Sequence, residues 1–325
     1  MKKKILLILT GGTISMNKRD EDQLVNISDE YDKVIDEVKD NLREIDLDYC
    51  VFSMVPSPHM KLTDMFNLSK LIDLKLNETN IDGIVVTHGT DTLEETSYMV
   101  DLYVNSKKPV VFTGSMRSHS DISYDGIRNL VSAILVASSD DSKNQGVLVV
   151  LNDEINSAAE VTKTHTLSLD TFKSLDFGPL GIIDNSSVYF YRTRIKNTKH
   201  IRPTEIIRNV EIVKISSGSS SLLLNLLIDN DIDGIILESL GRGNTTPDSL
   251  PGVIRAIEKN IPVVLTSRVP MGRVLGTYGY VGGGGHLEKL GVIFAPNLNS
   301  QKARIKLLML LNSDIETDDY YSYFK

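Results

Sequence analysis

Hydrophobic and polar positions alternate along the first half of the chain with two different periods. Short apolar runs rich in valine, isoleucine and leucine predict buried strands, and longer stretches with apolar residues every three or four positions predict helices. The strands are expected at 4–9, 49–54, 83–87, 109–113 and 146–151, and the helices at 30–42, 63–76, 93–104 and 124–138. Strands that alternate with helices form a parallel sheet covered on both faces. The pattern therefore predicts an α/β fold.

The same alternation returns after residue 210 and predicts a second, smaller α/β unit. Its strands are expected at 211–215, 234–238, 262–267 and 291–294, and its helices at 220–227, 250–258 and 301–311. The stretch 194–203 is polar and basic and ends in proline, which is typical of an exposed connector. We expect a larger N-terminal domain over 1–195 with a mostly parallel sheet and flanking helices, a connector over 196–210, and a C-terminal α/β domain over 211–325.

Charge and apolar length exclude several classes of ligand and location. The 325 residues contain 35 Lys and Arg against 43 Asp and Glu, a formal charge of −8, and the pI is about 5.3. We expect no nucleic-acid partner, because such binding needs a basic surface. No apolar stretch has the length of a membrane span, and the apolar run at 5–9 is too short for a secretion signal. A cytoplasmic protein without a membrane partner is expected. The single cysteine, Cys50, indicates a small buried residue.

Polar residues follow the expected strands, at the sheet edge where ligands bind in parallel sheets. The first strand runs into Thr10-Gly11-Gly12-Thr13, where a hydroxyl on a sharp turn could be a nucleophile. The alternative is a loop with glycines for the turn and threonines for hydrogen bonds. The strand at 83–87 runs into the sequence Thr-His-Gly-Thr-Asp-Thr at 87–92. Helix capping explains one or two of these polar residues but not all of them.

Two later strands are also followed by candidate chemistry. The strand at 109–113 leads into Gly114-Ser115, and the strand at 146–151 is followed by Thr162-Lys163. A lysine desolvated in a cleft beside a threonine can take up a proton from its hydroxyl. The alternative is a solvated surface cation, and the sequence leaves both interpretations open.

The motifs of cofactor and metal enzymes are missing from the sequence. There is no Walker loop, no Gly-x-Gly-x-x-Gly after the first strand, no His-Glu-x-x-His and no Gly-x-Ser-x-Gly. The six histidines show no metal-ligand spacing. We expect no metal and no cofactor.

The sequences Thr-Gly-Gly-Thr-Ile at 10–14 and Thr-His-Gly-Thr-Asp-Thr at 87–92 together resemble the two signature motifs of the bacterial-type L-asparaginase/glutaminase family. The similarity continues over nearly the whole chain, at 114–117, 125–126, 152–155, 161–163, 241–244, 267–268 and 301–304. The resemblance implies an amidohydrolase that converts L-asparagine and water to L-aspartate and ammonia without metal or cofactor.

The resemblance also implies roles for individual residues. Thr13 would be the nucleophile that forms the acyl enzyme. Thr90, Asp91 and Lys163 would form a second catalytic cluster in which the lysine favours an alkoxide-like Thr90. Asp91 would also bind the α-ammonium of the substrate, and Ser57 its α-carboxylate.

Further substrate contacts and a homo-oligomer follow from the same resemblance. Gly89 and Ser115 would line the substrate site beside Thr90. Family members assemble as dimers or tetramers in which the smaller domain of one subunit closes the site of another, and Asn244 would lie at that seam. On local grounds Asn244 could equally be a helix N-cap or turn residue.

The sequence departs from the family pattern near the nucleophile. Many relatives carry a tyrosine in the loop after it, but the loop 15–28 has none, and Tyr31 falls in an expected helix. We hypothesise that Tyr278 or Tyr280, in a Gly-rich segment, substitutes for it. The alternative is that these tyrosines cover a small apolar patch.

Other functions remain as alternatives to an L-asparagine amidohydrolase. One is an enzyme of mixed glutaminase and asparaginase specificity, and another is a non-catalytic amino-acid sensor with the same pocket. Two threonines and a lysine disfavour the sensor, because binding alone does not require them. An amidotransferase subunit acting on tRNA is disfavoured by the acidic composition and by the start of the chain directly at the first strand.

Overall fold

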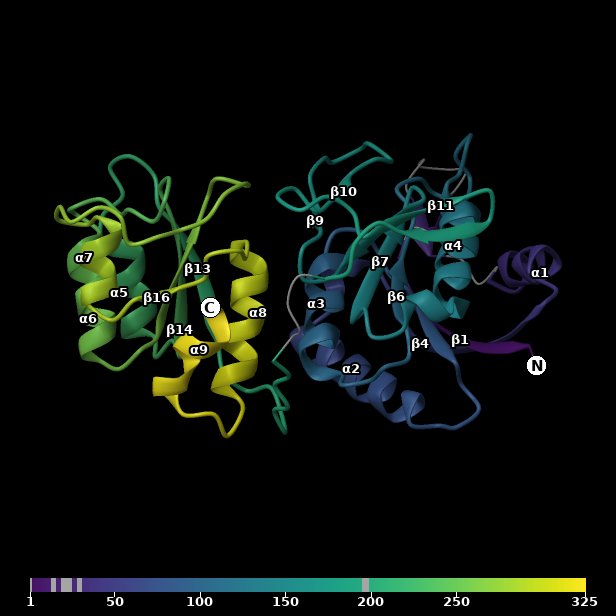
Figure 1. Cartoon of the computed structure of the whole chain (residues 1–325). Coiled ribbons are helices and arrows are strands. Elements are labelled where there is room, and N and C mark those ends of the chain that lie inside the picture. The colour runs from purple at the N-terminus through teal and green to yellow at the C-terminus, as the bar shows by residue number, and fades with distance from the viewer. Residues whose placement is uncertain (1, 13–15, 19–24, 28–30, 195–198) are drawn as a thin grey trace. The chain divides into compact units, whose positions relative to one another are not determined.

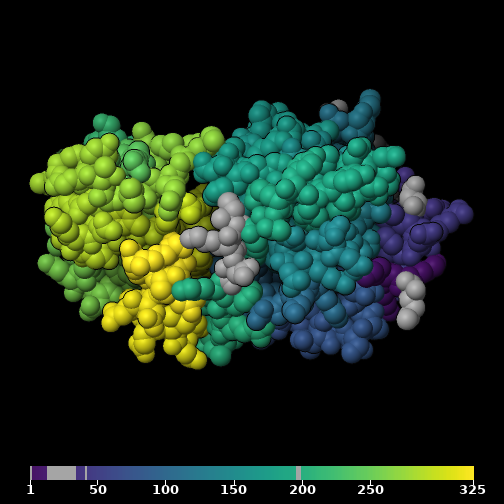
Figure 2. All heavy atoms as spheres, in the orientation of Figure 1, coloured from purple at the N-terminus to yellow at the C-terminus, as the bar shows by residue number. Residues whose placement is uncertain are grey.

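The computed structural model describes residues 2–12, 16–18, 25–27, 31–194 and 199–325. They belong to two compact units, Met1–His200 and Ile201–Lys325, shown as ribbons in Figure 1 and as spheres in Figure 2. The expected connector over 196–210 includes three residues outside the described ones, and its bounds stay a prediction.

The first unit is built on a mostly parallel sheet of eight strands among the described residues. Their order across the sheet is β12-β11-β8-β7-β6-β5-β1-β4. Strands β4, β1, β5, β6 and β7 are parallel, and β8, β11 and β12 continue the sheet antiparallel. The strands are β1 (Lys3–Gly11), β4 (Ile45–Val55), β5 (Gly83–Thr87), β6 (Val110–Thr113), β7 (Val147–Leu151), β8 (Glu154–Ser157), β11 (Gly181–Asp184) and β12 (Ser187–Phe190).

Helices cover both faces of this sheet (Figure 1). They are α1 (Tyr31–Asn41) and α4 (Gly126–Ser138) on one face, and α2 (Leu62–Leu76) and α3 (Leu93–Tyr103) on the other. Alternate residues of β1 enter the two cores, because successive side chains of a strand point to opposite faces. Ile5, Leu7 and Leu9 pack with α1 and α4, whereas Leu6 and Ile8 pack with α2 and α3.

Two short ribbons complete the described part of the first unit. β9 (Thr162–Lys163) pairs antiparallel with β10 (Phe172–Lys173), and β2 (Met16–Lys18) pairs antiparallel with β3 (Val25–Ile27). In the β9–β10 ribbon, Lys163 lies opposite Phe172. The ribbon therefore fixes the backbone of Lys163 beyond the edge of the main sheet.

The second unit has a parallel four-stranded sheet in the order β13-β14-β15-β16. Its elements are β13 (Val210–Lys214), α5 (Leu222–Asp229), β14 (Gly234–Ser239), α6 (Leu250–Glu258), β15 (Val263–Ser267), α7 (Gly284–Lys289), β16 (Ile293–Phe294), α8 (Ser300–Leu311) and α9 (Tyr320–Phe324). Figure 2 shows the C-terminal residues, in yellow, on the surface of this unit.

The fold class predicted from the sequence is confirmed: a larger unit with a mostly parallel sheet precedes a smaller α/β unit. The prediction missed the antiparallel strands β8 to β12 and the short helices α7 and α9. In the part of the chain that the structure describes, no helix is both long and apolar enough to span a membrane.

Candidate active site

The loop between β5 and α3 holds the first polar cluster. β5 is buried along its whole length, and Thr90 follows it with 7% of its surface exposed. Ser57, from a single helical turn after β4, packs against this loop: its Oγ accepts a hydrogen bond from the amide of Asp91 at 3.2 Å. The Thr92 hydroxyl donates to the carbonyl of Ser57 at 2.9 Å. The structure thus brings Ser57, Thr90 and Asp91 together.

Lys163 joins this cluster from the β9–β10 ribbon. Its Nζ donates to Thr90 Oγ1 at 2.9 Å and forms an ion pair with Asp91 Oδ1 at 2.8 Å. The lysine side chain is 18% exposed, whereas the aspartate is 61% exposed. A half-buried ammonium in contact with a buried hydroxyl can stabilise negative charge on that oxygen, because burial weakens solvent screening. Lys163 is therefore not the solvated surface cation of the alternative interpretation, because it is largely buried and bonded to both Thr90 and Asp91.

The loop after β1 approaches the same cluster. Gly11 and Gly12 have φ values of +103° and +86°, which only glycine adopts without strain. A Cβ on Gly12 would lie 2.6 Å from the Cα of Gly89, so the two backbones touch. Thr13, the predicted nucleophile, lies outside the described residues. Its neighbour Gly12 is nevertheless in contact with the residue that precedes Thr90.

His88 is completely buried directly before Gly89. Its Nδ1–H donates to the Gly89 carbonyl at 2.8 Å, because a carbonyl can only accept. The hydroxyl of Thr96 on α3 then donates to Nε2 at 2.9 Å. Desolvation by burial lowers the pKa of His88 to about 4, against an opposing contribution from the hydrogen bond to Gly89. His88 is therefore neutral, and its hydrogen bond holds the Gly89 backbone in place.

Ser115 lies beyond the end of β6, on the loop that follows Gly114. Its side chain is fully buried, and its Oγ has no hydrogen-bond partner among the described residues. A Cβ on Gly114 would overlap the carbonyl oxygen of His88 and lie 3.6 Å from Thr90 Cγ2. The loop that carries Ser115 is therefore packed against the loop that carries Thr90.

The remaining predicted residues belong to the second unit. Asn244 forms an isolated bridge with Leu240, and its Oδ1 accepts from the Gly284 amide at 3.2 Å. This is the turn role that the local sequence allowed. The rings of Tyr278 and Tyr280 lie 5.6 Å apart and are 44% and 55% exposed, respectively.

Searched over its described residues, the chain brings no three His, Cys, Asp or Glu side chains together as a metal site. Two features around the cluster were not predicted from the sequence: the hydrogen bond between His88 and Thr96, and the contacts of Asn129 on α4. The contacts of Asn129 have no local signal because Gly114 and Asn152 are distant in the sequence, whereas the partners of His88, Gly89 and Thr96, are close to it and the sequence does not show that its ring is buried. Asp125-Gly126, at the start of α4, was noticed as part of the family resemblance.

Comparison with known proteins places both units in one family. Residues 4–196 match the family described as Asparaginase, N-terminal, and residues 209–324 match the Glutaminase/Asparaginase C-terminal domain. An L-asparaginase of Bacillus licheniformis is 35% identical over 315 residues, which cover 96% of this chain and 97% of that protein. L-asparaginase 2 of Escherichia coli is 36% identical over 256 residues, 75% of this chain and 70% of that protein.

A solved structure gives the same result. The crystal structure described as a probable cytoplasmic L-asparaginase from Campylobacter jejuni matches with a TM-score of 0.90 and 34% identity over 99% of each chain. The fold and these matches define a two-domain α/β amidohydrolase. The chain belongs to the asparaginase family.

Proposed function

We propose that this protein hydrolyses the side-chain amide of L-asparagine to give L-aspartate and ammonia. The observation that carries the proposal is the contact of Lys163 Nζ with both Thr90 Oγ1 and Asp91 Oδ1. Amide hydrolysis needs a nucleophile, donors for the developing oxyanion and a proton for the leaving nitrogen. The relatives at 35% and 36% identity are named L-asparaginases, which supports the substrate.

In the proposed reaction the Thr13 hydroxyl attacks the amide carbon and loses its proton. The tetrahedral intermediate collapses when the nitrogen takes up a proton and leaves as ammonia, so an ester to Thr13 remains. Water then hydrolyses the ester and restores the hydroxyl. The Gly12–Gly89 contact supports the placement of Thr13 beside Thr90, and the cluster of Thr90, Asp91 and Lys163 handles protons there.

We assign substrate recognition to side chains whose donors or acceptors are still available for a ligand. The Ser57 hydroxyl accepts from the Asp91 amide and keeps its own proton to donate to the α-carboxylate. Asp91 Oδ2 is not used by Lys163 and can accept from the α-ammonium. A buried hydroxyl without a partner is costly, so Ser115 is assigned to the substrate amide, with the Gly89 backbone beside it.

The protein is further proposed to work as a homo-oligomer in the cytoplasm, with no metal or cofactor. Six apolar side chains of the second unit are exposed within a short stretch: Val269, Met271, Leu275, Tyr278, Tyr280 and Val281. An exposed patch of this kind is typical of a surface that a partner covers, and Asn244 supports the adjoining loop through Gly284. The Campylobacter jejuni protein described as cytoplasmic supports the location.

The test is ammonia release by the purified protein with L-asparagine, L-glutamine and D-asparagine in parallel. Thr13→Ala and Thr90→Val are expected to abolish turnover of L-asparagine. Thr164→Val is the matched control, because its hydroxyl donates to the Thr171 carbonyl and lies next to Lys163 in the sequence.

Other outcomes would replace the proposal. Equal turnover of L-glutamine would make the enzyme one of mixed specificity. No turnover together with a rise in melting temperature on adding L-asparagine would make the protein an amino-acid sensor. Light scattering on the same sample measures the oligomer, and a monomer with full activity would overturn the assembly.

A further inference from the structure

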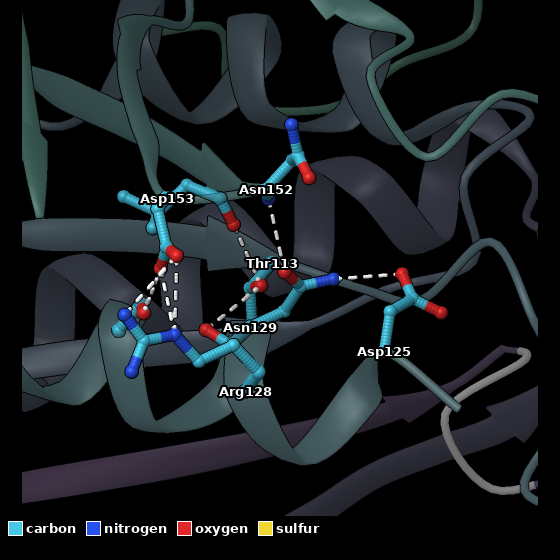
Figure 3. Close-up of polar contacts among 8 residues, drawn as sticks. Thr113, Asp125, Arg128, Asn129, Asn152 and Asp153 are labelled. Atoms are coloured by element: carbon cyan, nitrogen blue, oxygen red, sulfur yellow. Dashed lines mark hydrogen bonds and ion pairs between the residues drawn. The ribbon is translucent and has the colours of Figure 1, made fainter. Parts of the chain in front are cut away.

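Three segments of the first unit meet at the side chain of Asn129 on α4, and Figure 3 shows its contacts with Asp125 and Asn152. This side chain is 2% exposed. Its Nδ2 donates to the Gly114 carbonyl at 3.0 Å and to Asp125 Oδ2 at 2.9 Å. Its Oδ1 accepts from the backbone amide of Asn152 at 3.0 Å. Both amide hydrogens and the amide oxygen thus have partners, each on a different element.

Asp125 extends this arrangement along the loop after β6. Its Oδ2 accepts from the Met116 amide and its Oδ1 from the Arg117 amide, both at 3.0 Å. Asn129 and Asp125 therefore hold the backbone of three of the four residues 114–117. The fourth is Ser115, whose buried hydroxyl is unpartnered among the described residues.

The loop 114–117 in turn contacts the loop of the candidate site. A Cβ on Gly114 would overlap the carbonyl oxygen of His88 and lie 3.6 Å from the Thr90 methyl group, so the loop can pack against the 87–92 loop only because Gly114 has no side chain. Thr90 is held on another side by Lys163. A shift of the Gly114 backbone would consequently displace Thr90 or Ser115, or both.

We propose that Asn129 is a positioning residue for the reaction, acting with Asp125 through the loop 114–117. This inference rests on the proposed function, and Asn129 itself touches no substrate. The groups that it positions flank Thr90, which belongs to the cluster proposed to handle protons during the reaction. The groups assigned to the α-carboxylate and α-ammonium, Ser57 and Asp91, are bonded to each other and not to this loop. Loss of Asn129 should therefore lower kcat and leave KM nearly unchanged.

The chain offers a matched control on the same helix. Ser132 Oγ donates to Asp153 Oδ1 at 2.7 Å, and Arg128 Nε pairs with the same carboxylate at 3.0 Å. These bonds tie α4 to the turn of Asn152 and Asp153 and go to Asp153 rather than to the loop 114–117 (Figure 3). Ser132→Ala thus weakens the packing of the helix on that turn without releasing the loop.

The experiment measures kcat and KM for L-asparagine, and the melting temperature, in wild type, Asn129→Ala and Ser132→Ala. Asn129→Ala is expected to lower kcat about 100-fold, because a displacement of about 1 Å can have that effect, with KM within about threefold. Ser132→Ala should keep both constants within about twofold. Asp125→Asn, at a half-buried position, provides a second variant if Asn129→Ala does not fold, and it should show the same loss in kcat at constant KM.

Two results would overturn the positioning role. One is a folded Asn129→Ala, or in its place Asp125→Asn, whose kcat stays within about twofold of wild type. The other is an equal loss of kcat in Ser132→Ala, which would show a general loss of helix packing. A wild type that releases no ammonia from L-asparagine overturns the proposed function as well. An active wild type with an active Asn129→Ala overturns the positioning role alone.

Discussion

The backbones of Gly12 and Gly89 lie in direct contact, with a gap too small for even one extra carbon between them. Each glycine immediately precedes a threonine, Thr13 and Thr90. The two polar loops are therefore brought together by the absence of side chains. This relationship explains why a pair of glycine-containing motifs, separated by more than seventy residues, can form one site.

A methyl group on Gly12 is expected to separate the two loops. Gly12→Ala should destabilise the protein and lower kcat at least about tenfold, because the added Cβ meets the Gly89 backbone and the groups around Thr90 move. Gly218→Ala is the control, since Gly218 has a similar φ of +78° but nothing within 4 Å of its Cβ position. Both variants carry the strain of a left-handed alanine, about 1–2 kcal/mol. Urea unfolding measures the stability of both variants, and ammonia release measures their kcat. Equal losses in Gly12→Ala and Gly218→Ala would contradict a role for the contact between Gly12 and Gly89.

The charge of Lys163 is expected to act on the reaction more than on the fold. Lys163→Met removes the ammonium from Thr90 and should lower kcat about 100- to 10,000-fold, the range for lost proton transfer. Lys173→Met is the control on the same ribbon, because Lys173 pairs with Glu154 and Asp170 and lies opposite Thr162. Steady-state kinetics should show near wild-type kcat for Lys173→Met. A comparable loss in both variants would mean that the lysines only stabilise the ribbon.

The sequence predicted the central parallel strands well, because their burial is continuous, whereas β4 at the sheet edge is largely exposed or half-buried and begins at Ile45, before the predicted strand 49–54. β5 was predicted with the bounds that it has, since all five of its residues are buried between helices on both faces. The antiparallel strands were missed for the opposite reason. β7 and β8 are joined by Asn152 and Asp153, both with positive φ, and β11 and β12 by Asn185 and Ser186, so no glycine marks either turn. These short strands carry polar residues that have no clear period.

The candidate site was predictable only where its residues follow strands. Thr90, Asp91 and Lys163 were singled out because they follow strands, Ser57 was named only through the family resemblance, and the four residues lie together. The supports of the site were not predictable, because Asn129 bonds backbone atoms of other elements and the role of His88 at the adjacent Gly89 depends on the burial of its ring. The structure of the Gly-rich segment near Tyr280 was likewise not predictable from the sequence. Gly283 and Gly284 are closely packed against neighbouring backbone, and α7 begins there.

His88 should make the stability of the fold fall in mild acid. Burial lowers the pKa of His88 to about 4, from its ordinary value of 6.5. Between these two pH values the unfolded chain binds a proton that the folded chain does not, so stability rises with pH. The contribution of the neutral imidazole is fully present above pH 6.5 and is lost as the pH falls to about 4, a change of about 3 kcal/mol.

Urea unfolding at several pH values tests this expectation. His88→Asn keeps an N–H that can reach the Gly89 carbonyl but does not titrate, so its stability should fall less between pH 7 and pH 4 than that of wild type. His59→Asn, at an exposed position, serves as the control and should follow wild type. Parallel curves for wild type and His88→Asn would contradict the buried neutral state.

The buried ion pair of Asp101 and Arg194 is expected to contribute strongly to the stability of the first unit. The two guanidinium–carboxylate bonds measure 3.0 and 2.9 Å, and the side chains are 2% and 9% exposed, respectively. Arg194→Met leaves the Asp101 carboxylate buried without the guanidinium, while the Val147 amide still donates to it. Removal of one partner from a buried pair costs about 3–5 kcal/mol, because the other charge loses both water and its counterion.

An exposed pair provides the comparison for this prediction. Arg208→Met, which removes an ion pair with Asp233 at a largely solvated arginine, should cost about 0–1 kcal/mol. The double variant Arg194→Met with Asp101→Leu should recover part of the loss, since no buried charge is then left without a counterion. Urea unfolding gives the free energy of unfolding of wild type, the two single variants and the double variant. If Arg194→Met costs no more than Arg208→Met, water reaches Asp101, and the end of α3 opens more readily than its burial indicates.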